Sequence, residues 1–185
     1  MTKGKSDRLS PQPGPAAWHF PVVVEDIDEA GQHFELIADA DIRAAVAKAA
    51  NLRALPRLEA RFDVTRLGAD TAHVVGRVSA TVGQTCVVTV EPLENEVEEA
   101  VDMRFVVPQP AVLKDGEPEP KRRDVKWSDP EPLIGGIVDL GAIAAEFLIL
   151  GLDPYPRKAG AVFEPPADIK PEEGPFAALG KLAKG

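Results

Sequence analysis

The chain has 185 residues, of which 44% are hydrophobic, and a formal net charge of −9 at pH 7. A chain of this length can fold as one domain without a metal ion or a disulfide, and its single cysteine excludes an internal disulfide. The negative charge argues against a nucleic-acid binder that works only by releasing counterions from phosphates.

The N-terminal region predicts a disordered tail. Residues 1–17 carry three prolines and few apolar side chains, a composition that does not support a packed core. No apolar segment follows the basic N-terminal residues, so a secretory signal is not expected. The longest apolar run, residues 141–150, is too short for a transmembrane helix. We therefore expect a cytoplasmic protein that does not act at a membrane.

Two short strands are expected first along the chain. Residues 18–24 form an apolar run, in which Pro21 favours a position at the edge of a sheet. Residues 32–38 are expected to form a second short strand after an acidic turn.

A helix is expected next. Asp39 or Asp41 can cap its N-terminus, and the helix is expected to reach about Arg53 and to end before Pro56. Apolar side chains recur at helical spacing and predict a buried stripe formed by Ile42, Ala45, Val46 and Ala49.

Four strands with period-two alternation are expected after this helix, at residues 61–66, 72–82, 84–91 and 97–107. Short polar connections, such as the turn at residues 67–70, favour an antiparallel meander with one buried and one solvated face. In the third of these strands Cys86 shares the apolar face with Val88 and Val90. We therefore expect a buried, reduced cysteine without a chemical role.

The remaining elements complete the expected fold. Residues 109–130 are polar and proline-rich, which predicts a mobile loop. Residues 133–138 favour a short strand, and Asp139 is expected to cap a second helix through about Leu150. Its predicted buried stripe consists of Leu140, Ile143, Ala144, Phe147 and Leu148. The fold class is α+β: an antiparallel meander or partly closed sheet with two packed helices and disordered, proline-rich tails.

One folded domain is expected over residues 18–157, followed by a flexible tail over residues 158–185. Near its end Phe176, Leu179 and Leu182 lie at i, i+3 and i+6, so one helical turn over residues 176–182 would present all three. A segment this short becomes ordered only by docking, either on its own domain or on a partner.

Patterns of catalytic, metal-binding or cofactor-binding residues are missing from the sequence. His19, His33 and His73 are far apart and do not show the spacing of metal ligands, and no phosphate-binding glycine motif is found. The carboxylates of residues 94–99 are typical of a solvated face. An enzyme would need a cleft lined by carboxylates with altered pKa values. We expect no catalytic residues, no metal, no cofactor and no small-molecule substrate, and thus a protein that is not an enzyme.

Three segments carry family motifs in order. Residues 84–92 read QTCVVTVEP, residues 131–141 read EPLIGGIVDLG and are followed by Glu146 and the run LILGLDP, and residues 175–182 read PFAALGKL. They resemble the cysteine-bearing strand, the D-L-G…E…L-x-L-x-x-P signature and the N-P-F-A-x-L-x-x-L ending of the YceD family, the large ribosomal RNA subunit accumulation proteins. The match extends from about residue 18 to residue 182, in the style of the α-proteobacterial branch.

The chain departs from this family pattern at two positions. Gly174 stands where asparagine is common, and Gly83 stands at the first position of the C-x-x-C that many members carry. A metal or redox role based on a cysteine pair is therefore not expected here.

The resemblance implies a non-catalytic role in the accumulation, processing or stability of large-subunit ribosomal RNA, and hence in ribosome biogenesis. Because the chain is acidic, we expect it to act through contacts with ribosome-assembly proteins or pre-ribosomal particles. Candidate docking residues are those of the tail turn and of the second helix, if that helix is not fully used in the core: Phe176, Leu179, Leu182 and Glu146.

The alternative is direct RNA binding through local basic residues. One group lies in the proline-rich loop, at Lys121, Arg122 and Arg123, and a second follows the first helix, at Arg53, Arg57 and Arg61.

Overall fold

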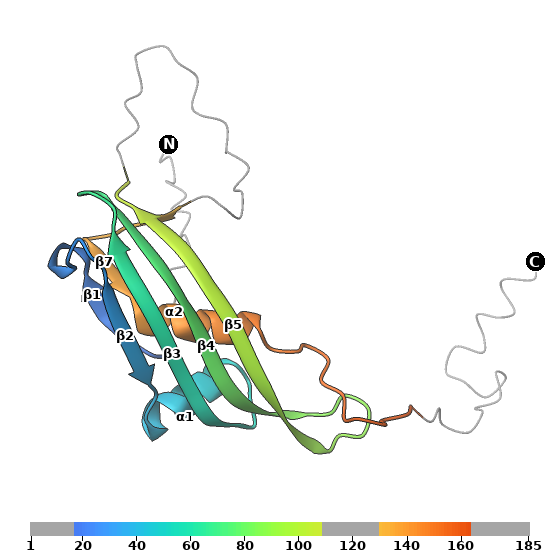
Figure 1. Ribbon diagram of the computed structural model, residues 1–185. Coiled ribbons are helices and arrows are strands. Elements are labelled where there is room, and N and C mark those ends of the chain that lie inside the picture. The colour runs from blue at the N-terminus through green and yellow to red at the C-terminus, as the bar shows by residue number, and fades with distance from the viewer. Residues whose placement is uncertain (1–16, 109–129, 164–185) are drawn as a thin grey trace, which may run out of the picture.

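A computed structural model describes residues 17–108 and 130–163 of the chain (Figure 1). The described elements are, in chain order, β1 (Pro21–Val23), η1 (Val24–Asp26), β2 (Gln32–Ile37), α1 (Ala40–Ala49), β3 (Ala54–Arg66), β4 (Thr71–Thr85), β5 (Pro92–Val106), β6 (Glu131–Pro132), β7 (Ile137–Asp139) and α2 (Leu140–Leu150). The predicted α+β class is confirmed.

Several predicted features lie outside the described residues. They are the N-terminal tail up to residue 16, the proline-rich loop with Lys121, Arg122 and Arg123, and the C-terminal segment with Phe176, Leu179 and Leu182.

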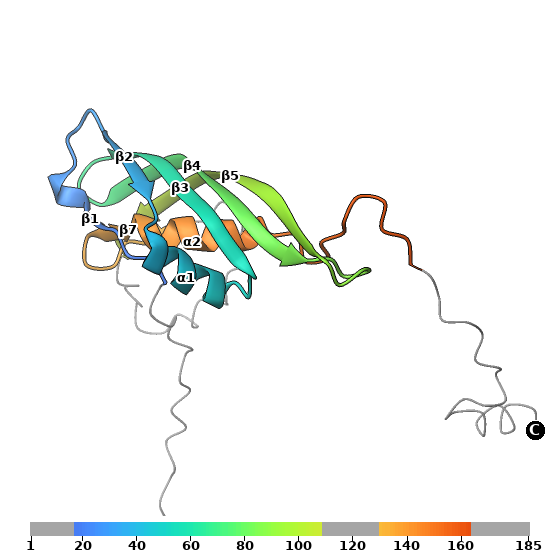
Figure 2. The same ribbon diagram turned by 90° about the horizontal axis from the view of Figure 1, so that it is seen from below.

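The main sheet has the strand order β2-β3-β4-β5-β6 and does not close on itself. Neighbours from β2 to β5 are antiparallel, and β6 pairs in parallel with the end of β5. The predicted meander is thus confirmed, whereas the partly closed form is not what the structure has. A second, two-stranded sheet joins β1 to β7. Figure 2 shows α1 and α2 beneath the same face of the main sheet.

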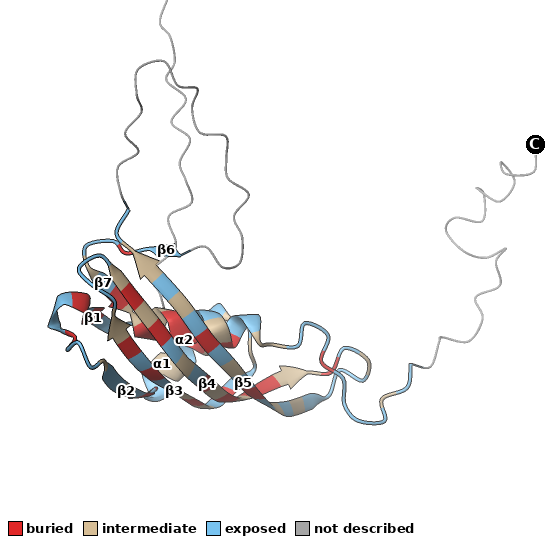
Figure 3. Cartoon of the chain, turned by 45° about the horizontal axis from the view of Figure 1, so that its top comes forward, coloured by how far each residue is buried: buried red, intermediate tan, exposed pale blue. Residues whose placement is uncertain are grey.

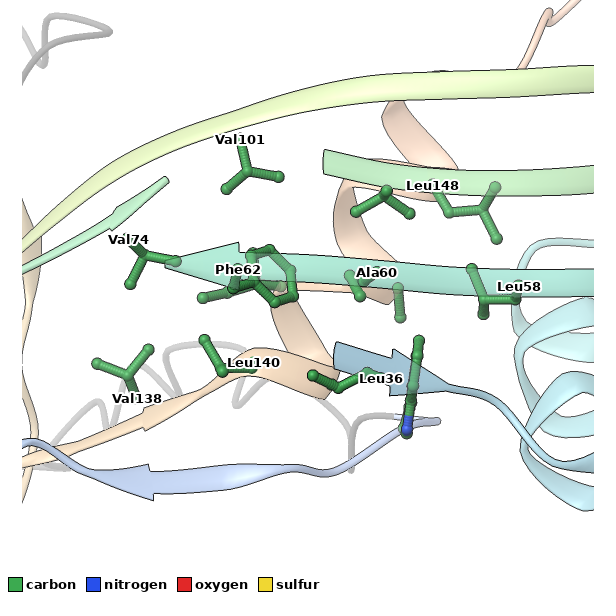
Figure 4. Close-up of a cluster of buried hydrophobic side chains, with 14 of the residues drawn as sticks. Leu36, Leu58, Ala60, Phe62, Val74, Val101, Val138, Leu140 and Leu148 are labelled. Atoms are coloured by element: carbon green, nitrogen blue, oxygen red, sulfur yellow. The ribbon is translucent and has the colours of Figure 1, made fainter. Parts of the chain in front are cut away.

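Alternation along the long strands separates a buried from a solvated face, visible as alternating bands in Figure 3. On β4, Val74, Val78, Ala80 and Val82 are fully buried. Phe62 on β3 lies at the centre of the core, among side chains of the sheet and of α2 (Figure 4). It faces Gly76 on β4, where an added Cβ would lie 2.5 Å from the Phe62 ring. A glycine is required at this position because the ring occupies the space of a side chain.

Helix α1 begins as predicted and differs in its buried side. The Asp39 side chain accepts a hydrogen bond from the Ile42 N–H at 2.8 Å, which caps the first turn. Val46 is fully buried and Ile42 is half-buried, but Ala45 and Ala49 are exposed, so the predicted stripe is wrong at both alanines. Small side chains tolerate either environment, and therefore the spacing of alanines did not define the buried side.

Helix α2 is confirmed in its cap, its extent and its buried stripe. The Asp139 carboxylate accepts from the Ala142 N–H at 3.0 Å. The stripe of Leu140, Ile143, Ala144 and Leu148 is buried, and Phe147 is half-buried against the core.

Strand β3 begins at Ala54, well before the predicted start at residue 61, and contains Pro56. A register shift between Ala54 and Arg57 marks an irregularity in its pairing with β4. This shift accommodates the proline and also interrupts the alternation of Leu55 and Leu58, which hid this half of the strand from period-two analysis.

The predicted strand at residues 84–91 is wrong. Strand β4 continues to Thr85, and residues 86–91 form the turn to β5, closed by hydrogen bonds from the Cys86 N–H to the Glu91 carbonyl and from the Val90 N–H to the Cys86 carbonyl. Val90 adopts a φ of 61°, which is unusual for a β-branched residue. The turn contains valines and threonine where turns usually have glycine or asparagine, so its sequence resembles a strand.

Two further strand predictions need correction. The run at residues 18–24 is a strand only over Pro21–Val23 and continues as a short 3-10 helix. Of the single strand expected at residues 133–138, only Ile137 and Val138 form a strand, β7, whereas residues 133–136 form the turn from β6, in which Gly135 and Gly136 have φ values of 64° and 71°. In the described part of the chain, no helix is long and apolar enough to cross a membrane.

Candidate functional site

The turn around Cys86 is fixed by the chain that follows α2. The Val87 N–H donates to the Pro156 carbonyl at 2.9 Å, and Lys158 Nζ lies 2.9 Å from a carboxylate oxygen of Glu91. Lys158, expected to begin the flexible tail, is therefore bound to the domain.

The Cys86 thiol is enclosed in this arrangement with an exposure of 1%. Its Sγ accepts hydrogen bonds from the Lys158 N–H at 3.3 Å and the Thr89 N–H at 3.4 Å. These bonds, the one from Lys158 above all, favour the thiolate over the opposing effect of burial and lower the pKa of Cys86 from 9.0 to about 6.

Burial of Cys86 is thus confirmed, but the reason given for it is wrong. Cys86 does not share a strand face with Val88 and Val90, since Val90 is 75% exposed at the tip of the turn. An enclosed thiolate with no second cysteine in the chain cannot reach a substrate, so the low pKa alone does not make a nucleophilic site.

Each of the three histidines contacts one aspartate. His19 lies 2.7 Å from Asp139, and equivalent pairs join His33 to Asp63 at 2.8 Å and His73 to Asp102 at 2.7 Å. The partners are 120, 30 and 29 residues apart in sequence, so no sequence spacing indicated them. Within residues 17–108 and 130–163, no group of three His, Cys, Asp or Glu side chains is placed to hold a metal ion.

Asp139 joins the N-terminal segment to α2. Besides capping α2 and contacting His19, its carboxylate accepts a hydrogen bond from the Phe20 N–H at 2.8 Å. Partial burial acts to raise the pKa of Asp139, but the hydrogen bonds from Phe20, His19 and Ala142 together outweigh burial and lower it. This role is structural.

The solvated face of the main sheet carries cross-strand ion pairs. Three arginines contact carboxylates on other strands: Arg57 on β3 contacts Glu96 across β4 at 2.7 Å, and neighbouring strands are joined by Arg61 with Glu35 at 2.8 Å and Arg77 with Glu98 at 2.9 Å. Two of the three basic residues proposed for RNA contact after the first helix, Arg57 and Arg61, are therefore neutralised by partners within the sheet.

A groove of about 540 Å³ lies along α1 and the start of β3, and its charged lining residues differ from those of the solvated sheet face. Its apolar lining includes Ala40, Ala44 and Leu55, and its cations are Arg43, Lys48 and Arg53. Among the residues that the structure describes, no carboxylate lines this groove. A second groove of about 350 Å³ lies between the end of α1 and residues 84–87 and 152–156, and Asp153 is the acidic residue in its lining. Within residues 17–108 and 130–163, neither groove is lined by a pair of carboxylates.

Glu146, the remaining candidate docking residue, is exposed on α2. The other candidate docking residues, Phe176, Leu179 and Leu182, lie outside the described part of the chain.

Comparisons with known proteins do not indicate a function for this chain, which is therefore inferred from the sequence motifs and the geometry. The chain matches no protein-family model, and no curated protein and no solved structure matches it either.

Proposed function

We propose that the protein is a non-catalytic accessory factor in ribosome biogenesis, related to the YceD family. In this role it supports the accumulation, processing or stability of large-subunit ribosomal RNA through contacts with assembly proteins or pre-ribosomal particles in the cytoplasm. The ribosomal part of the proposal rests on the three motifs, which occur in order over nearly the whole chain.

Protein contact is favoured over RNA contact by one observation on the solvated sheet face. Arg57, Arg61 and Arg77 each contact a carboxylate, so the charges of these three arginines are compensated and attract phosphates less strongly. The net charge of −9 acts in the same direction.

Depletion of the protein from cells tests the ribosomal part. We expect the ratio of large-subunit to small-subunit ribosomal RNA to fall, and re-expression of the wild-type chain to restore it. An unchanged ratio after complete depletion would refute the proposal.

Affinity capture with and without nuclease tests the mode of contact. Ribosomal or assembly proteins that stay bound after nuclease treatment support protein contact. A Phe176→Ala/Leu179→Ala variant tests the tail turn in the same assay: we expect weaker capture with an almost unchanged melting temperature. A large fall in melting temperature would instead make this segment part of the core.

Direct RNA binding is the second candidate, and the α1 groove is the observation that favours it. Arg43, Lys48 and Arg53 gather there without a lining carboxylate. If RNA binds there, affinity for ribosomal RNA fragments falls steeply with salt, and a Lys48→Glu/Arg53→Glu variant loses it. An Arg61→Glu/Arg104→Glu variant is the matched control, since it makes the same charge change on the opposite face of the sheet.

A further inference from the structure

Strand β5 forms a long open border of the main sheet. It pairs with β4 over its whole length, from Pro92 to Val106, without a register shift. On its other side, β6 pairs only with Phe105 and Val106. Figure 3 shows β6 at this one end of β5, and in the part of the chain that the structure describes no other strand borders β5 there.

Hydrogen bonds at both ends of β5 define which backbone groups point outward. The Val106 carbonyl accepts from the Leu133 N–H on the outer side, whereas the Val107 N–H donates to the Asp70 carbonyl on the β4 side. At the other end, the Glu91 carbonyl faces the β4 side and accepts from the Cys86 N–H.

Alternate residues of an antiparallel strand direct both their N–H and their C=O groups to one side. Even-numbered residues, among them Glu98, Ala100 and Asp102, therefore direct both groups to the open border.

The exposed charged side chains along this border are acidic from Glu94 to Asp102, and Arg104 follows them near the β6 end. Glu98 contacts Arg77 through Oε2, and Asp102 contacts His73 through Oδ1. The second oxygen of each carboxylate has no hydrogen-bond partner among the described residues. Glu94 and Glu96 continue the same exposed row towards the Cys86 turn.

A second copy of the chain does not fit this border well. Antiparallel pairing of two β5 strands about Ala100 would place Glu98 of one copy opposite Asp102 of the other at the centre of the pair, although Glu96 would then lie opposite Arg104. Like charges directly opposite each other destabilise strand pairing.

We propose that the β5 border accepts an extended cationic segment of a partner protein as an added strand. The outward N–H and C=O groups of Glu98, Ala100 and Asp102 would supply the backbone pairing. The second carboxylate oxygens of Glu98 and Asp102 would select lysine or arginine at alternate positions. This inference names a partner class for the protein contacts of the proposed function and rests on that function for its cellular meaning.

Binding of a synthetic probe to the full-length protein tests the inference without cells. The probe is a fluorescein-labelled nonapeptide of alternating lysine and valine, measured by fluorescence anisotropy. One control peptide is N-methylated at alternate backbone nitrogens, and another has glutamate in place of lysine. We expect each change to weaken binding at least about tenfold, because each removes either the backbone pairing or the charge complementarity.

Substitutions in β5 locate the binding site. Ala100→Pro removes an outward N–H that the sheet does not use, a position where proline is tolerated, and we expect it to abolish peptide binding. Glu98→Gln/Asp102→Asn keeps the strand intact and is expected to weaken binding several-fold. Glu25→Gln/Glu29→Gln, which removes two exposed carboxylates elsewhere, is the matched control and is expected to change nothing.

Two results with the peptides would overturn the inference: the N-methylated peptide binds as tightly as the probe, or neither β5 variant weakens binding of the probe. Two other partners would also overturn it. These are single-stranded oligouridylate, if it binds at this border more tightly than the probe, and a second copy of the chain, if light scattering shows dimers that Ala100→Pro dissociates. If Ala100→Pro does not fold, peptide binding by the Glu98→Gln/Asp102→Asn variant decides whether β5 is the binding site. A normal ribosomal RNA ratio after depletion would refute the proposed function while leaving a positive peptide result standing.

Discussion

The two faces of the main sheet are made by the same strands but are held in place by different interactions. Towards the helices, Phe62 and Val78 have no exposed surface. On the other face, the side chains of Arg61 and Arg77 are 68% and 63% exposed while they contact carboxylates. Full burial of one large apolar side chain stabilises a fold by about 1.5–3 kcal/mol, whereas an exposed ion pair contributes about 0–1 kcal/mol.

The two faces therefore contribute differently to the stability of the fold. Stability comes from the face covered by α1 and α2, so the solvated face can change its charges at little cost in folding free energy. Substitutions on the two faces should therefore differ strongly in their effect on unfolding.

The largest effect is expected at the centre of the buried face. Phe62→Ala removes a fully buried ring and leaves a cavity beside Gly76, which should lower the free energy of unfolding by about 3–5 kcal/mol in urea denaturation. Val75→Ala on the solvated face is the control and should change it by no more than about 0.5 kcal/mol. Equal losses at both positions would contradict the division between the faces.

The next effect concerns the carboxylate that joins the N-terminal segment to α2. Asp139→Ala should cost about 1–2 kcal/mol, because it removes the helix cap. Asp139→Asn keeps an acceptor oxygen and should lose less.

The dependence of stability on pH provides a second test of the role of Asp139. Because folding lowers its pKa, its stabilisation is present above the ordinary value of 3.8 and is lost as the pH falls through the folded value. The stability difference between wild type and Asp139→Asn should therefore shrink below about pH 4. A difference that does not depend on pH would contradict the charged role.

An effect that varies with pH is expected at the Cys86 turn, where a buried group depends on polar contacts. The pKa of Cys86 falls from 9.0 to about 6 on folding. The resulting stabilisation is therefore complete above pH 9 and is lost as the pH falls through 6. Under reducing conditions, the melting temperature of the wild-type protein should therefore increase relative to that of Cys86→Ala as the pH is raised from about 6 to 9. Parallel melting profiles would mean that the thiol stays protonated in the folded protein.

The smallest effect is expected for a single ion pair of the solvated face. A double-mutant cycle with Arg77→Ala and Glu98→Ala should give a coupling free energy of about 0.2–1 kcal/mol. This coupling should decrease as NaCl is added, because salt screens exposed charges. A coupling above about 2 kcal/mol, independent of salt, would show that this face contributes to stability as the buried face does.

The sequence predicted most reliably the elements whose apolar side chains are large and regularly spaced. The buried stripe of α2 and the alternation from Val97 to Phe105 on β5 were recognised because leucine, valine and phenylalanine are strongly selected for burial. Ala45 and Ala49 on α1 were misplaced because alanine carries little such preference.

Contacts between distant segments were not predictable in the same way. The pairing of His19 with Asp139 joins residues 120 positions apart, and the hydrogen bond from Lys158 to Cys86 joins residues 72 positions apart. No local pattern marks either contact. The strand-like valines at residues 86–91 were misinterpreted because their turn is held by Pro156 and Lys158 as well as by its own hydrogen bonds.

By itself, the sequence determined the α+β class, the antiparallel meander and the Asp139 cap of α2. These features depend on side-chain periodicity and on hydrogen bonds between near neighbours, both of which can be read locally. Only the tertiary structure decided that residues 86–91 turn, that Arg57 and Arg61 are neutralised by carboxylates, and that among the described strands only β6 pairs with the outer side of β5. Each of these depends on which distant segments lie side by side, and the packing of the whole chain selects that arrangement.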